Sequence, residues 1–302
     1  MSGAGESRSA ESGIVLEGSI YEDAWRRLSQ TLREALDGPL REYASLYVTS
    51  YVVGIKLVYV RLEGGWCGVS FSPACQNGKE PDVPLLGITP RMLVRLVEKE
   101  RSPTAAALAL AAVNAATSAL IGERGMAPPL RVARSSTDVV EAARVKKGDT
   151  VIFFGFMRSL AEASRQRGAR VYVVELSSKL AREAASLGFH AIFDAEKALK
   201  LVRKADVVFF SGSSLLYPSI TLTEVQEAIG ARERVLVGRT SSFHPLVSRR
   251  LGFTIQGGIF IDRSLCWHVE KVVSLGGGLR SPKLRKATVV KWLARLREPD
   301  QQ

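Results

Sequence analysis

The stretch "VIFFGFMRSL", residues 151–160, decides the fold class, because an apolar run breaks there at Gly155 and continues as the start of a helix. Three more short apolar runs follow, each after a segment long enough for a helix: "ARVYVVEL" (169–176), "ADVVFFSG" (205–212) and "RVLVGR" (234–239). Near-continuous apolar strands that alternate with helices are typical of a parallel sheet covered on both faces. The sequence therefore predicts an α/β fold with a Rossmann-like parallel sheet over residues 148–302.

Two later segments complete this C-terminal unit. The run "GFTIQGGIFID" (252–262) is interrupted by glycines, which predicts an edge strand or a return strand. The segment "RSPKLRKATVVKWLARLRE" (280–298) places Val289, Val290, Leu293 and Leu296 at helical spacing, with Lys and Arg between them. This pattern predicts a basic amphipathic C-terminal helix that packs by its apolar side.

Residues 19–147 have a different character and predict a smaller α+β domain. A helical pattern over 19–38 is followed by β-branched and aromatic residues over 45–62, which indicate one or two strands. The segment 64–74 reads as the partner strand of a hairpin, and Thr-Pro and Ser-Pro pairs at 89–90 and 102–103 indicate two helix starts. Residues 1–18 are expected to be a disordered lead.

Composition limits the class of protein. The apolar fraction of 46% and charged fraction of 24% are ordinary globular values. No apolar run reaches the roughly 18 residues that span a bilayer, and the first residues lack a basic start followed by an apolar core. We therefore expect a cytoplasmic protein with no membrane span, and a homo-oligomer remains open.

Net charge and cysteine content bear on nucleic-acid binding and on the redox state of the thiols. The net charge of +12 raises nucleic acid as a partner, although no nucleic-acid motif is present and a solvated basic face is the favoured explanation of the charge. The three cysteines, Cys67, Cys75 and Cys266, cannot all pair within one chain and show no CxxC spacing. We expect reduced, structural thiols.

Candidate site residues follow the four apolar runs, because ligands of doubly wound sheets bind beyond the carboxyl ends of the strands. Hydroxyl-rich turns after the third and fourth runs can bind an anion or carboxylate, or can act as helix caps. His244 is the histidine we select for metal binding or chemistry, with a structural role as the alternative. The residues concerned are Gly155, Phe156, Arg158, Glu175, Ser211, Gly212, Ser213, Ser214, Gly238, Arg239, Thr240, Ser241 and Ser242.

Glu175 lies 20 residues after Gly155, the separation of the acidic residue that binds ribose in dinucleotide folds. However, "GFMRSL" lacks the second and third glycines of that fingerprint, and Phe156 and Arg158 take the space of a pyrophosphate. NAD and FAD are therefore disfavoured, whereas adenosylmethionine or a nucleotide remains possible. The alternative is that Glu175 caps the next helix or pairs with a basic side chain.

The order of these motifs, from "AALALAAVNAA" (106–116) through "GDTVIFFGFM", "VYVVEL" and "ADVVFFSGSSL" to "VLVGRTSSFHPLVSRRLGFTIQGG", resembles the family labelled "putative heavy-metal chelation". In that family a Rossmann-like domain follows a domain similar to the N-terminal domain of enolase. The resemblance implies a ligand cleft between the two domains, to which Asn114 would contribute. Tyr217-Pro218 and Arg239 depart from the family's turns.

Three functions remain open. The first is a protein that binds a small molecule, a divalent transition metal or a metal complex in the interdomain cleft, with His244 and Cys67 as metal-ligand candidates. The second is a transferase that uses adenosylmethionine or a nucleotide, with Glu175 on the ribose. The third is a nucleic-acid-interacting protein whose contact surface is the basic C-terminal segment.

Overall fold

The computed structural model describes residues 18–73, 84–135, 137–175, 177–279 and 290–296. The fold class predicted from the sequence is confirmed: a mostly parallel eight-stranded sheet stands beside a small antiparallel three-stranded sheet. The small sheet is a meander in which β2 pairs with both neighbours. Its strands are β1 (Val48–Val53), β2 (Leu57–Leu62) and β3 (Cys67–Phe71).

The large sheet has the order β4-β11-β10-β9-β8-β5-β6-β7. Strands β5 to β10 run parallel, whereas β11 and β4 are antiparallel to their neighbours. The winding direction changes between β5 and β8, which places a topological switch point there. The strands are β4 (Leu130–Val132), β5 (Thr150–Phe154), β6 (Arg170–Val174), β7 (His190–Ile192), β8 (Val207–Ser211), β9 (Glu233–Val237), β10 (Ile255–Phe260) and β11 (Val290–Arg295).

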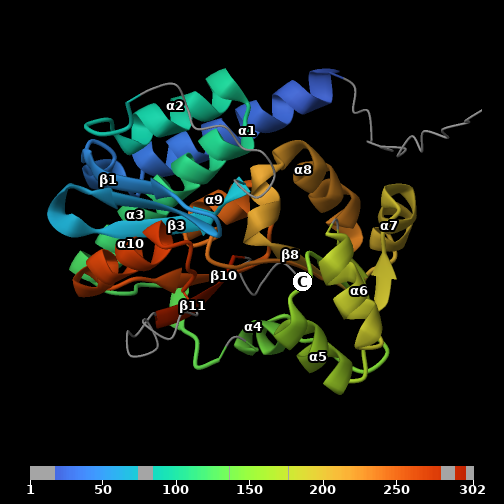
Figure 1. Ribbon diagram of the computed structural model, residues 1–302. Helices are drawn as coiled ribbons and strands as arrows, with labels where there is room; N and C mark the ends of the chain where they lie inside the picture. The colour runs from blue at the N-terminus through green and yellow to red at the C-terminus, as the bar shows by residue number, and fades with distance from the viewer. Residues whose placement is uncertain (1–17, 74–83, 136, 176, 280–289, 297–302) are drawn as a thin grey trace, which may run out of the picture.

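Helices cover both faces of the large sheet, so its central strands are buried on both sides (Figure 1). Alternate residues explain this: Val151 and Phe153 face one cluster, whereas Ile152 and Phe154 face the other. The first face carries α4 (Asp138–Ala142), α5 (Arg158–Gln166) and α6 (Ser178–Ser186). The second carries α7 (Ala195–Val202), α8 (Pro218–Glu227) and α9 (Pro245–Arg250), with α1 (Gly18–Asp37) packed outside α8 and α9.

The helix α3 (Pro103–Arg124) is the central helix of the molecule, packed against α2 (Pro90–Glu100), β2 and β3. Thr89 and Ser102 cap α2 and α3 by accepting backbone N–H groups, as the Thr-Pro and Ser-Pro pairs predict. The sequence reading overlooked that α3 is long and apolar enough to cross a bilayer by length and composition; 89% of that stretch is buried inside the protein. It is a core helix here.

The prediction of a basic C-terminal helix is wrong for residues 290–295, which form the strand β11. Trp292 and Ala294 are buried on one face and Leu293 on the other. A strand buried on both sides has apolar residues at successive positions, and such a run also fits helical spacing. Apart from Leu296, the rest of that predicted helix, residues 280–289 and 297–298, lies outside the described residues, as does most of the predicted N-terminal lead.

Two other strand expectations change. The glycine-broken run 252–262 contains β10, which is an interior strand between β9 and β11 and not an edge. The glycines of this run let neighbouring side chains pack directly against its backbone, since a Cβ on Gly258 would overlap the Trp292 ring. Residues 130–132, which we assigned to the first domain, form β4 in the large sheet. The division of the chain at residues 18 and 147 otherwise stays a prediction.

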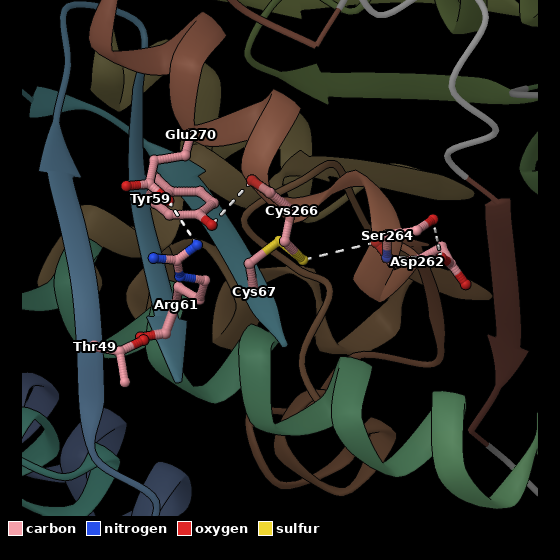
Figure 2. Close-up of a disulfide and its surroundings, with 8 residues drawn as sticks. All are labelled: Thr49, Tyr59, Arg61, Cys67, Asp262, Ser264, Cys266 and Glu270. Atoms are coloured by element: carbon pink, nitrogen blue, oxygen red, sulfur yellow. Dashed lines mark hydrogen bonds and ion pairs between the residues drawn. A yellow bond between two sulfur atoms is a disulfide. The ribbon is translucent and has the colours of Figure 1, made fainter. Parts of the chain in front are cut away.

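The expectation of reduced thiols is wrong for Cys67 and Cys266, which form a disulfide. It joins β3 to the start of α10 (Cys266–Ser274), with Cα atoms 5.6 Å apart, and both residues are buried. Figure 2 shows that the Tyr59 hydroxyl also donates to the Cys266 carbonyl, at 3.0 Å. The small sheet is thus packed between α3 and α10. Cys75 lies outside the described residues.

Candidate functional site

A cleft of about 1220 Å³ lies beyond the carboxyl ends of β5, β8, β9 and β10. Leu57 and Phe71 of the small sheet face these strand ends from the other side. The cleft therefore has walls from both parts of the chain. Seven of the residues selected from the sequence line it: Phe156, Arg158, Ser211, Ser213, Gly238, Arg239 and Thr240.

The turn after β5 is built around Gly155, whose φ of 89° favours glycine. A Cβ at this position would lie 2.9 Å from the Ser211 Cβ, so glycine also lets the ends of β5 and β8 approach each other. Glu175 supports the turn from β6: its carboxylate accepts the Phe156 N–H at 2.8 Å and the Ser177 N–H at 2.9 Å. Both oxygens of Glu175 thus have backbone partners.

The ribose-binding role of Glu175 stays a prediction, and so does binding of adenosylmethionine or a nucleotide. A ribose hydroxyl would have to compete with the two backbone N–H groups for this carboxylate. Phe156 packs against Phe189, with ring centroids 5.9 Å apart. Arg158, the first residue of α5, pairs with Glu162 at 2.9 Å.

The turn after β8 presents hydroxyls to the cleft. The Ser211 and Ser213 Oγ atoms lie 2.8 Å apart and share a hydrogen bond, and both residues line the cleft. Gly212 lets this turn contact the next one, because a Cβ there would lie 2.8 Å from the Ser241 nitrogen. The Ser214 Oγ is buried and has no hydrogen-bond partner among the described residues.

The turn after β9 joins the two parts of the molecule. The Thr240 Oγ1 accepts the Phe71 N–H of β3 at 2.9 Å. The Asn114 Nδ2 of α3 lies 2.7 Å from the Val69 carbonyl oxygen, 3.2 Å from that of Arg239 and 3.1 Å from that of Thr240. Since an amide has two hydrogens, it satisfies two of these carbonyls at a time. Asn114 therefore positions the cleft turn from behind.

Ser241 and Ser242 are structural residues of the same turn. The Ser241 Oγ lies 2.9 Å from the carbonyl oxygens of both Gly238 and Gly257. The Ser242 Oγ donates to the Arg239 carbonyl at 2.7 Å and accepts the Ile259 N–H at 3.0 Å. These hydroxyls hold the shape of the turn and do not line the cleft.

His244 and Cys67 lie outside the cleft wall. The His244 Nδ1 accepts the Leu246 N–H at 3.2 Å and caps α9, and burial lowers the pKa of its imidazole to about 4. Cys67 carries no free thiol, so the hypothesis that it is a metal ligand is wrong. Over the described ranges, no group of three or more His, Cys, Asp or Glu side chains could hold a metal ion.

The charges in the cleft wall favour anions. The cleft wall contains three cationic side chains, Arg158, Arg239 and Lys291, and two carboxylates, Glu162 and Glu183, so positive charge exceeds negative charge there. Sequence reasoning missed Lys291 because it was placed on the outer face of a helix. It also missed Leu57 and Phe71, because nothing in a hairpin sequence indicates which turns it will face.

Comparison with known proteins identifies relatives across most of the chain. A family model described as "Putative heavy-metal chelation" (DUF364) matches residues 138–290, and a second model with the same description (DUF4213) matches residues 40–117. No curated protein has a significant match.

Two solved structures share the fold. A DUF364-family protein of unknown function from Pyrococcus horikoshii is 16% identical, with a TM-score of 0.66 over 89% of this chain and 99% of that one. A DUF364-family protein of unknown function from Desulfitobacterium hafniense DCB-2 is 19% identical, with a TM-score of 0.61 over 88% of this chain and 98% of that one. At these identities the likeness shows the fold alone.

Proposed function

The chain belongs to the family described as "Putative heavy-metal chelation", and on this basis we propose that its cleft binds an anionic small molecule that carries a heavy-metal ion. The metal is the cargo of this ligand, whose own donor atoms complete its coordination. The observation that carries the proposal is the chemistry of the cleft wall: it offers cations and hydroxyls, and no cluster of metal-donor side chains exists among the described residues.

A bare heavy-metal ion does not fit these residues. Soft metals prefer thiolate and imidazole donors, and neither lines the cleft. In contrast, Arg239 and Lys291 match the negative charge of a carboxylate-bearing complex. The hydroxyls of Ser211, Ser213 and Thr240 add donors that can orient such groups. At about 1220 Å³ the cleft is larger than the about 300–1,000 Å³ that small-molecule sites usually enclose, so it has room for such a ligand.

The test is isothermal titration with Ni²⁺–citrate, citrate alone and Ni²⁺ alone, together with metal analysis and native mass spectrometry of the purified protein. We expect saturable binding of Ni²⁺–citrate, and Arg239→Gln should weaken it about tenfold because a charged hydrogen-bond donor is lost. The matched control is Arg95→Gln on α2, which removes the same charge from an exposed position outside the cleft.

Two outcomes would overturn the proposal. One is equally tight binding of Ni²⁺ alone, unchanged by Arg239→Gln. The other is a purified protein with neither metal nor a bound anionic molecule that also fails to bind the citrate complex. Adenosylmethionine is titrated in the same series, because the β5–β8 switch point is where nucleotide-binding folds hold their ligands. Its binding, lost in Glu175→Ala, would favour the transferase.

A further inference from the structure

A second cavity, of about 540 Å³, lies at the opposite edge of the large sheet and shares no residue with the cleft. It is formed by β6, the edge strand β7 and the helix α7, which stands at the right-hand edge of Figure 1. None of the three functions considered from the sequence uses these residues.

Aromatic side chains form the floor of this cavity. Tyr172 of β6 and His190 of β7 are register partners, so both side chains point to the same face of the sheet. Their rings are stacked, with centroids 5.1 Å apart. Phe193 directly follows β7 and is 62% exposed, an unusual position for a large apolar ring. Because the Tyr172 and His190 rings stack on each other, the exposed Phe193 ring is the aromatic surface most open to a ligand.

Lysines form the opposite wall. Lys197, Lys200 and Lys204 line the cavity at spacings of three and four residues, which place them on one side of α7 and its C-terminal extension. Lys200 also pairs with Glu196 at 2.6 Å, where both side chains are largely exposed. Asp194, an acid that lines the cavity, accepts the Lys197 backbone N–H and caps α7. Positive charge therefore exceeds negative charge beside the aromatic floor.

We propose that this cavity binds a nucleoside phosphate, with its base stacked on the exposed Phe193 ring and its phosphate beside the lysines. Every nucleobase presents a flat ring face, and stacking on aromatic side chains combined with a basic groove is how proteins hold single-stranded nucleic acid without reading its sequence. The same chemistry is present in a free nucleotide and in one unit of a single strand. The cavity volume accommodates one such unit.

The experiment titrates AMP and a fluorescein-labelled ten-nucleotide poly(dA) strand into the full chain at several salt concentrations. Phe193→Ala should weaken binding at least about fivefold, the lower end of the effect of losing one stacked base. Lys197→Ala combined with Lys204→Ala should reduce the salt slope for the strand by about 1.4, because each phosphate contact contributes about 0.7. The charge-matched control is Arg95→Ala with Lys99→Ala, both exposed on α2.

The two probes separate the sources of the ligand. Comparable affinity for AMP and the strand indicates a free nucleotide, whereas binding of the strand alone indicates a nucleic acid; both support the proposal.

Binding of neither probe would refute it, and so would equal losses in the control variant. Sedimentation that reveals a dimer broken by Phe193→Ala would also overturn it, since the cavity would then be an interface between copies. Ni²⁺–citrate binding should be unchanged in Phe193→Ala, which keeps this result separate from the cleft.

Discussion

At the scale of the residue, His244 was a candidate metal ligand in the sequence, and in the structure it is a partly buried helix cap. Its Nδ1 accepts the Leu246 N–H, and this role requires an imidazole without a proton on that atom. Burial lowers its pKa to about 4 from the ordinary value of 6.5. The unfolded chain therefore takes up a proton at a higher pH than the folded chain does.

This difference predicts that the protein loses stability as the pH falls from about 6.5 to 4. Across this window the unfolded state binds more protons, so the free energy of unfolding should fall by about 3 kcal/mol. Urea unfolding at a series of pH values measures it. His244→Asn keeps a cap acceptor without titrating, so its loss over the window should be smaller by that amount. Equal pH dependence in the two proteins would show that His244 does not titrate as described.

A second residue-scale prediction concerns Asn114. Replacing it with Leu removes the donor to the Val69, Arg239 and Thr240 carbonyls, which we expect to cost about 2–3 kcal/mol. Because the Arg239–Thr240 turn loses its support, Ni²⁺–citrate affinity should fall as well. Thr117→Val on the same helix is the control, since its hydroxyl bonds only to the Val113 carbonyl within α3. Its effect on both quantities should be small.

At the scale of the element, the contact of α3 with β3 depends on Gly68. A Cβ there would overlap the Ala111 carbonyl oxygen and the Ala115 nitrogen, both of which belong to the rigid helix backbone. We expect Gly68→Ala to destabilise the protein by about 3 kcal/mol, at the upper end of overpacking effects. Thermal unfolding measures this, and Gly230→Ala is the control because a Cβ at that position would meet no atom within 4 Å. Similar melting temperatures for both variants would contradict the close approach.

The same elements show what the sequence could predict. Parallel strands are covered on both faces, so β5, β6, β8 and β9 appear in the sequence as continuous apolar runs and could be predicted. The starts of α2 and α3 could also be predicted, because each begins with a proline after a Ser or Thr cap. The strand β11 was not, because apolar residues at 290, 292, 293 and 294 fit a helix as well as a doubly buried strand. The pairing of this segment with β10 and β4 decides between a helix and a strand.

For the candidate site, the sequence predicted the three turns after the strands, but not which of their side chains line the cleft and which only stabilise the turn. It selected Ser213 and Ser242 for the same reason, a hydroxyl after a strand end. In the structure Ser213 lines the cleft, whereas Ser242 bonds to the Arg239 carbonyl and the Ile259 N–H. These partners come from β10 and from the turn itself, so the distinction depends on tertiary contacts that no local pattern contains.

At the scale of the whole molecule, the disulfide joins residues 199 positions apart and connects the small sheet to the helix that follows the large sheet's last parallel strand. It therefore restrains the two walls of the cleft relative to each other. A crosslink that closes so long a loop removes much of the freedom of the unfolded chain. Replacing Cys67 and Cys266 by Ala should lower the free energy of unfolding by about 3–5 kcal/mol.

Alkylation in denaturant without reductant, followed by intact mass, tests the bond directly. With three cysteines in the chain and two of them paired, one label should add before reduction and three after it. Cys75→Ala should then take no label until a reductant is present, which identifies the labelled residue. Since Cys67 and Cys266 are buried, the rate at which a reductant cleaves the disulfide in the native protein should be limited by the rate of local unfolding. Three labels on unreduced protein would show that the walls of the cleft are held by packing and by the Asn114 and Thr240 hydrogen bonds alone.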